Sequence, residues 1–237
     1  MAKLVQKSGY IKSGKASGYM RYIATREGVE KLVGNSAVTK GQRELIQKLL
    51  HDFPDAVELF EYEDYCRTPT LGTASAFISM ALDTNLHEID PESGYMQYIA
   101  TRPRVQKRGT HGLFSSATAV DLASAISELE AHEGNVWTII YSLRREDADR
   151  LEYDNADAWR TLLMENAPTL AKSMKISLDN FHWYAAFHDE GHHPHIHMMV
   201  WSDDPKEGFL TEDGIAAMRS KLTNAIFRDE MQQIYGR

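Results

Sequence analysis

The chain has 237 residues, of which 43% are hydrophobic and 25% are charged, proportions typical of a globular protein with a substantial core. No apolar run approaches the roughly 20 residues that a transmembrane helix needs, and the N-terminus lacks the apolar segment of a signal peptide, so we expect no membrane insertion. A single cysteine excludes an internal disulfide framework and favours the reducing cytoplasm.

The net charge of −8 argues at first against a nucleic-acid partner, but the charge is unevenly distributed. Residues 1–50 contain ten Lys/Arg and three Glu, and residues 93–112 contain four Lys/Arg and no acid. Two basic segments on an otherwise acidic chain can guide a phosphate backbone. Charge alone leaves open whether they bind DNA or are only solvated faces.

In chain order, the pattern predicts a first strand over 3–11 and a flexible basic loop over 12–18. The segment 17–29 then recurs at 93–105 as Ser-Gly-Tyr-Met-x-Tyr-Ile-Ala-Thr-Arg-x-x-Val, with ten of thirteen positions identical. Because a solenoid needs at least three repeats, we interpret the two copies as a duplicated local element within one fold.

Apolar spacing predicts helices over 39–53, 55–67, 74–86, 118–134, 158–174 and 215–234. The first of these begins at a capping box formed by Thr39 and Gln42, and we expect a break in the fifth near Pro168. The clearest central strand covers 136–143. This order predicts an α+β fold, an antiparallel β-sheet with helices packed mainly on one face.

The most informative stretch, 181–202, is predicted to be two short strands joined by a polar connection. Side chains two apart in a strand share a face, so His195 and His197 point the same way. If the strands pair as a hairpin, His188 faces the same point, and Pro194 suits the entrance of the second strand. Three converging imidazoles form an open metal site with positions left for water or substrate.

The alternative to this open metal site is a closed, structural one. A closed structural zinc site would need a fourth ligand, usually a cysteine, and Cys66 is distant in sequence. His192 and His193 fall in the connection, where we expect them to be solvated or at most to support the ligands. Three tryptophans are expected in the core and not as base-stacking platforms: Trp137, Trp183 and Trp201.

A metal site, two basic segments and clustered tyrosines together suggest phosphodiester chemistry. A tyrosine hydroxyl can attack a phosphodiester and hold it as a covalent ester. A metal ion can polarise the scissile phosphate, and basic residues can hold the flanking backbone. The tyrosyl ester conserves the bond energy, so the strand can be rejoined.

The spacing of His188, five residues, and then Pro194-His195-x-His197 resembles the third motif of the HUH endonucleases. Within these it most resembles the relaxases of conjugative and mobilisable elements, the Mob class. Three companion segments resemble the MobL/MobP-type branch: Trp137–Ala148, Trp183–His188 and Tyr22–Arg26.

This resemblance implies a relaxase-like sheet fold, with residues 1–237 as a single catalytic domain. Because the sequence stops at Tyr235-Gly-Arg237 without a terminal signal, we also expect it to be the N-terminal part of a longer protein. It implies nicking and rejoining of one DNA strand at a transfer origin through a 5′-phosphotyrosyl link. It also implies a divalent ion, Mn²⁺ or Mg²⁺, although three imidazoles would suit Zn²⁺ or Ni²⁺ as well. The implied partners are single-stranded DNA, accessory relaxosome proteins and a coupling protein.

The family usually places its nucleophile soon after the first strand, which favours Tyr22, with Tyr19 next. Tyr95 and Tyr98 are the corresponding tyrosines of the second copy and stay open as candidates. Beside the ligands, Asp189 or Glu190 either orients a histidine through its other ring nitrogen or is only a solvated acid of the turn, and the sequence leaves both open. Relatives often carry an acid in this connection, but at an offset that falls here on Gly191.

The candidate DNA contacts are basic residues of the two basic segments: Lys12, Lys15, Arg21, Arg26 and Arg102. Three alternatives to a relaxase remain open from the sequence. One is a replication initiator or transposase with the same chemistry. The others are a DNA-binding module without catalysis and a three-histidine metal hydrolase that forms no covalent intermediate.

Overall fold

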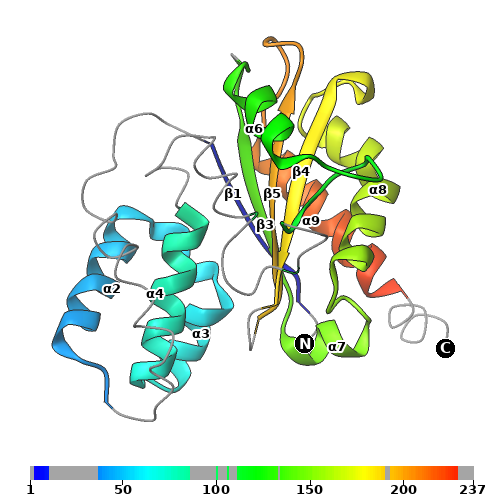
Figure 1. The fold of residues 1–237 in the computed structure, drawn as a ribbon. Helices are drawn as coiled ribbons and strands as arrows, with labels where there is room; N and C mark the ends of the chain where they lie inside the picture. Colours follow the sequence, from blue (N-terminus) through cyan, green and yellow to red (C-terminus); the bar gives the residue numbers. More distant parts are fainter. Residues whose placement is uncertain are drawn as a thin grey trace. The chain divides into compact units, whose positions relative to one another are not determined.

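The computed structural model describes residues 3–10, 37–85, 100, 106, 111–132, 134–189 and 193–228. The chain divides into two compact units (Figure 1). The first contains Met1–Ile11 and Glu92–Arg237, and the second contains Lys12–Pro91. Both copies of the duplicated element, apart from Ala100, lie outside the described residues, as does Ile234.

The first unit is built on a five-stranded sheet in the order β1-β3-β5-β4-β2, in which every neighbouring pair is antiparallel. The strands are β1 (Val5–Tyr10), β2 (Leu113–Phe114), β3 (Trp137–Ser142), β4 (Phe181–His188) and β5 (His195–Ser202). The predicted α+β class with an antiparallel sheet is therefore confirmed. The hairpin is also found, because β4 pairs with β5 along its whole length.

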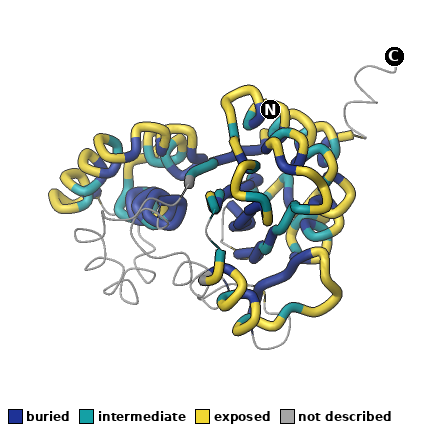
Figure 2. The backbone as a smooth tube through the Cα atoms, turned by 90° about the horizontal axis from the view of Figure 1, so that it is seen from above, coloured by how far each residue is buried: buried dark blue, intermediate teal, exposed yellow. Residues whose placement is uncertain are grey.

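Two helices, α8 (Ala156–Ser173) and α9 (Glu212–Ile226), pack on each other and cover one face of this sheet (Figure 1). Alternate strand residues supply the core beneath them: Ile139, Tyr141, Trp183, Ala185, Phe187, Ile196, Met198 and Val200. Trp183 and Trp201 are buried and Trp137 packs against the core, as predicted for the three tryptophans. The tube in Figure 2 shows the strands of the first unit buried and the outer sides of its helices exposed.

The expected break at Pro168 is wrong, because α8 continues through this residue. Proline removes one backbone hydrogen bond, but packing offsets that loss here. Within α8, Trp159 is fully buried and its Nε1 donates to Tyr153 O at 2.8 Å. Asn155 caps the first turn by accepting from Ala158 N.

Shorter elements complete the first unit: α6 (Leu122–Glu130), α7 (Arg145–Arg150) and the 3-10 turn η4 (Leu178–Asn180). β2 was not predicted, since two residues are too few to show an alternating pattern. In the described part of the chain, none of the helices combines the length and the hydropathy that a bilayer crossing requires.

The second unit contains α2 (Lys40–Asp52), η2 (Pro54–Glu58), α3 (Phe60–Arg67) and α4 (Leu71–Asn85). The predicted capping box is present, with Gln42 N donating to Thr39 Oγ1 at 3.2 Å and Thr39 N donating to Gln42 Oε1 at 3.0 Å. The Gln42 amide also donates to Leu71 O, so the cap joins α2 to α4.

Candidate metal centre

Three histidines from two neighbouring strands converge on the sheet face opposite α8 and α9. His188 at the end of β4 lies directly opposite His195 at the start of β5, and His197 follows two residues later on the same side. All three side chains are fully buried, and one ring nitrogen from each lies within 4.8 Å of the others. The predicted convergence of these rings is thus found.

This spacing fits one ion. Two imidazole nitrogens at about 2.0–2.1 Å from a tetrahedral ion are about 3.3 Å apart. The ring nitrogens therefore need to approach by at most about 1.5 Å, which small rotations of the three side chains provide. Imidazole suits Zn²⁺ and Ni²⁺ better than it suits Mg²⁺ or Mn²⁺, which prefer oxygen ligands.

One ring is oriented by the backbone. His195 Nδ1 lies 3.0 Å from the carbonyl oxygen of His193, and a carbonyl only accepts, so Nδ1 carries the proton. The lone pair is then on Nε2, the atom available to a metal.

His193 was expected to be solvated or to support the ligands. It is only 4% exposed, so the solvated reading is wrong, whereas its carbonyl supports His195. The connection has already joined the sheet at this point, because Leu143 N donates to Pro194 O. His192 lies outside the described residues.

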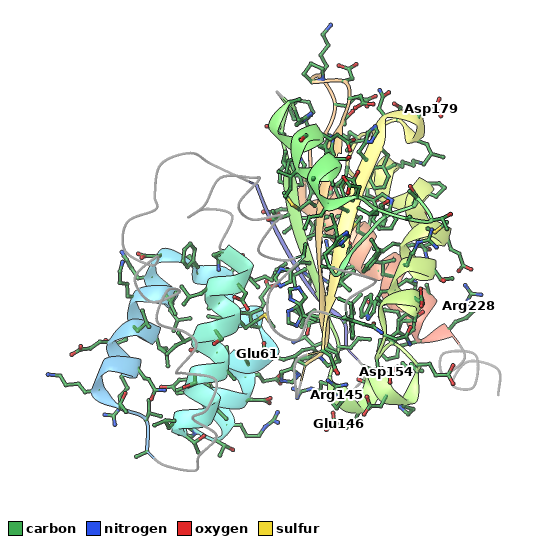
Figure 3. All side chains as sticks on the ribbon, in the orientation of Figure 1. Glu61, Arg145, Glu146, Asp154, Asp179 and Arg228 are labelled. Atoms are coloured by element: carbon green, nitrogen blue, oxygen red, sulfur yellow. The ribbon has the colours of Figure 1, made fainter. Side chains whose placement is uncertain are left out.

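The acids of the connection are only partly described. Asp189 is exposed and forms an ion pair with Arg145. Arg145, labelled in Figure 3, is the first residue of α7, which follows the end of β3. Glu190 and Gly191 lie outside the described residues, so the role of the Glu190 carboxylate stays a prediction. The same holds for the candidate nucleophiles and DNA contacts: Tyr19, Tyr22, Tyr95, Tyr98, Lys12, Lys15, Arg21, Arg26 and Arg102.

Two tyrosines of the sheet have described side chains, and neither of these is placed to attack a phosphate at the triad. Tyr141 points into the core on the opposite face, where burial raises the pKa of its phenol. Tyr184 shares the face of the triad but lies four residues, about 13 Å, along β4 from His188. Burial and the hydrogen bond that it donates to Glu128 raise the pKa of Tyr184.

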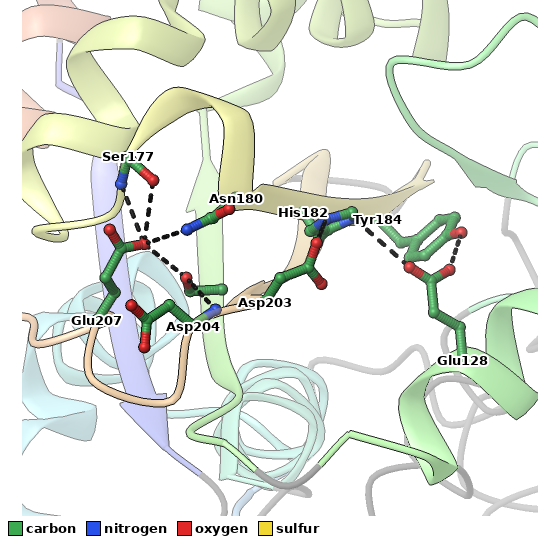
Figure 4. Close-up of polar contacts among 9 residues, drawn as sticks. Glu128, Ser177, Asn180, His182, Tyr184, Asp203, Asp204 and Glu207 are labelled. Atoms are coloured by element: carbon green, nitrogen blue, oxygen red, sulfur yellow. Dashed lines mark hydrogen bonds and ion pairs between the residues drawn. The ribbon is translucent and has the colours of Figure 1, made fainter.

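A separate polar cluster lies far from the triad, where β4 begins and β5 ends (Figure 4). The Glu207 carboxylate accepts hydrogen bonds from Ser202 Oγ at 2.7 Å, from Asn180 Nδ2 at 3.2 Å and from both the backbone and the hydroxyl of Ser177. His182 lies between Asp203 and Glu128. These contacts hold the loop after β5 to the sheet.

The fold and the triad define this chain as an antiparallel-sheet protein with a three-histidine centre suited to a metal ion. Among known families, the model of the MobL relaxases matches residues 1–235. The chain therefore belongs to the MobL relaxases, as the sequence motifs predicted. No curated protein and no solved structure matches the chain at a significant level.

Proposed function

We propose that this MobL relaxase nicks and rejoins one DNA strand at the transfer origin of a plasmid or mobile element. Three fully buried imidazoles that converge from paired strands carry the proposal, in a chain that the relaxase family covers almost completely. Residues 1–237 act in it as one catalytic domain in the cytoplasm. Its partners are single-stranded DNA, accessory relaxosome proteins and a coupling protein.

The triad has the donor set for a divalent ion. His188, His195 and His197 would hold it, with Mn²⁺ or Mg²⁺ expected from the family and Zn²⁺ or Ni²⁺ as alternatives. Such an ion, when bound, polarises the scissile phosphate and stabilises the charge that develops on it. The contribution of the chain is orientation, because the His193 carbonyl fixes the tautomer of His195.

The bond change takes place at a tyrosine. The Tyr22 hydroxyl oxygen forms a bond to phosphorus and loses its proton to the solvent, while the bond from phosphorus to the 3′ oxygen breaks. That oxygen takes up a proton, which leaves a free 3′ hydroxyl and a 5′-phosphotyrosyl link. The reverse attack by a 3′ hydroxyl rejoins the strand.

The chain is long enough to return Tyr22 to the triad. Val5 is level with His195 in the sheet, whereas Tyr10 is level with Val200, about 17 Å further along. Tyr22 is the twelfth residue after Tyr10, and an extended chain of twelve residues spans about 40 Å. Tyr19 satisfies the same condition.

The tyrosines of the second copy (93–105) must be tested together with those of the first. The described residues in and just after this copy, Ala100 and Gln106, are hydrogen-bonded to residues in or beside the sheet near the triad. Ala100 O accepts from Gly112 N at 2.7 Å, next to β2. Gln106 N donates to Phe187 O at 2.9 Å, and Phe187 directly precedes His188. We therefore keep Tyr95 and Tyr98 beside Tyr22 and Tyr19.

Covalent trapping tests the proposal. A randomised single-stranded DNA library labelled at its 3′ ends would be incubated with the protein and Mn²⁺, with and without chelator, and run on a denaturing gel. We expect a chelator-sensitive adduct that Tyr22→Phe abolishes without loss of DNA binding, while Tyr65→Phe, a change on α3, leaves it intact.

The other outcomes separate the competing functions. An adduct that survives in Tyr22→Phe and maps to another tyrosine reassigns the nucleophile. Cleavage without an adduct establishes a metal hydrolase, and DNA binding without cleavage establishes an inactive module. A replication initiator or transposase would also form the adduct, but the family match favours the relaxase.

A further inference from the structure

Two polar side chains share the face of the triad and are almost completely buried. Ser142, the last residue of β3, is 3% exposed, and Lys7 in the middle of β1 is 7% exposed. Lysine is rarely buried to this extent in a protein. Neither residue belongs to the hydrophobic core under α8 and α9.

The register of the sheet places both beside the histidines. Ser142 is directly opposite His195, so their Cβ atoms are about 5 Å apart on the same face. Lys7 is opposite Ile140, which is opposite His197. Because strands are about 4.8 Å apart, Lys7 begins about 10 Å from His197 in the same row.

The side chain of lysine closes much of that gap. Its four-carbon stem carries the ammonium about 6 Å from the Cα atom. Lys7 and Ser142 are also diagonal neighbours, since Val5 is the residue opposite Ser142, and such pairs are within reach of a long side chain. A group above the triad can therefore meet both.

The other side of the triad is apolar in the same row. Beyond His197, the described residues of β4 and β2 supply Ala186 and Leu113. In the rows of His195 and His197, the polar residues of β3 and β1 are Ser142 and Lys7, so donors flank the triad on this side.

We propose that Lys7 and Ser142 bind the non-bridging oxygens of the scissile phosphodiester, and so hold it over the β3 and β1 side of the triad. An ammonium and a hydroxyl both donate, and phosphate oxygens only accept. This assignment rests on the proposed nicking function, but phosphate binding can be measured without nicking.

The experiment measures phosphate and cleavage separately. Binding of inorganic phosphate to the Mn²⁺-loaded protein would be followed by the Mn²⁺-induced relaxation of the ³¹P signal. For Lys7→Met we expect about 10- to 100-fold weaker phosphate binding, the range for losing a hydrogen bond to a charged group. Mn²⁺ affinity should stay unchanged, and Lys7→Arg should recover most of the phosphate affinity.

Ser142→Ala keeps the test valid if Lys7→Met does not fold, because it removes one oxygen atom from a small side chain. There we expect about 3- to 10-fold weaker phosphate binding. The control is Lys3→Met, which removes an exposed lysine just before β1. In the trapping assay, both site variants should slow adduct formation by similar factors.

Folded variants that bind phosphate and form adduct within twofold of the wild type would overturn the assignment. A variant that loses thermal stability but keeps its phosphate affinity would show that Lys7 is only a structural charge. Failure of the nicking function is distinguishable, because the wild type then forms no adduct while the phosphate measurement still reports on Lys7 and Ser142.

Discussion

Replacing His197 by Ala should remove most of the stabilisation that a metal ion gives to this fold. An ion that binds only the folded state at 100 times its Kd stabilises it by about 2.7 kcal/mol. For a chain of 237 residues, each kcal/mol shifts Tm by about 2–4 °C, so the wild type should gain about 5–11 °C.

The variant keeps two of the three ligands. Loss of a residue that only supports a ligand weakens metal binding 10- to 100-fold, so loss of a ligand should cost at least 100-fold. The ion is then near its Kd, and the remaining stabilisation is about 0.4 kcal/mol, a shift of about 1–2 °C. The loss of stability caused by the cavity that the imidazole leaves does not affect this shift, because the Tm of each variant with metal is compared with its own Tm without metal.

Thermal unfolding of chelator-treated protein, followed by circular dichroism with Mn²⁺, Mg²⁺, Zn²⁺ or Ni²⁺ added separately, measures these shifts. His51→Ala is the matched control, since His51 is exposed on α2. A His197→Ala protein with the full metal-induced shift would place the ion elsewhere. A wild type that none of the four ions stabilises at millimolar concentration would refute the metal centre.

Three further predictions concern stability. The hydrogen bond from Ser202, followed by those from Asn180 and Ser177, holds the pKa of Glu207 below its ordinary value. The ionised carboxylate therefore stabilises the fold at neutral pH, and this stabilisation is lost as the pH falls through the lowered pKa. Glu207→Gln should therefore lower Tm at pH 7, and the difference from the wild type should shrink below about pH 4 in a pH series. Trp159→Ala should cost about 3–5 kcal/mol in urea unfolding, because the ring is fully buried, and a loss below 1 kcal/mol would contradict its place in the core. Thr39→Ala should cost about 1 kcal/mol by the same measurement, whereas Thr39→Ser should cost little because it keeps the cap.

The convergence of the three histidines could be predicted because its information is local. A strand alternates its side chains, so His195 and His197 share a face in any strand. The short connection then forces β4 and β5 to pair, which brings His188 opposite His195. The capping box at Thr39 was predicted for the same reason, since both of its partners lie within one turn.

The positions of Lys7 and Ser142 beside the histidines could not be predicted from the sequence, because they depend on how distant strands pair. Their relation to His195 depends on the register of β1 against β3 and of β3 against β5, strands separated by long stretches of chain. Binary patterning assigns faces within a strand, but it does not assign which residues of distant strands are opposite each other. From the sequence, Lys7 was one basic residue among ten in its segment.

The position of β5 explains how the backbone fixes the positions of the triad. A register slip of one residue would turn every side chain of a strand to the other face, so His195 and His197 would enter the core. β5 is paired on one side with β3 and on the other with β4, each along six or more residues. A slip would therefore break two ladders and remove Met198 and Val200 from the core at once. Main-chain pairing and the core on the opposite face thus hold the strands that carry the ligands, and the carbonyl of His193 sets the tautomer of His195.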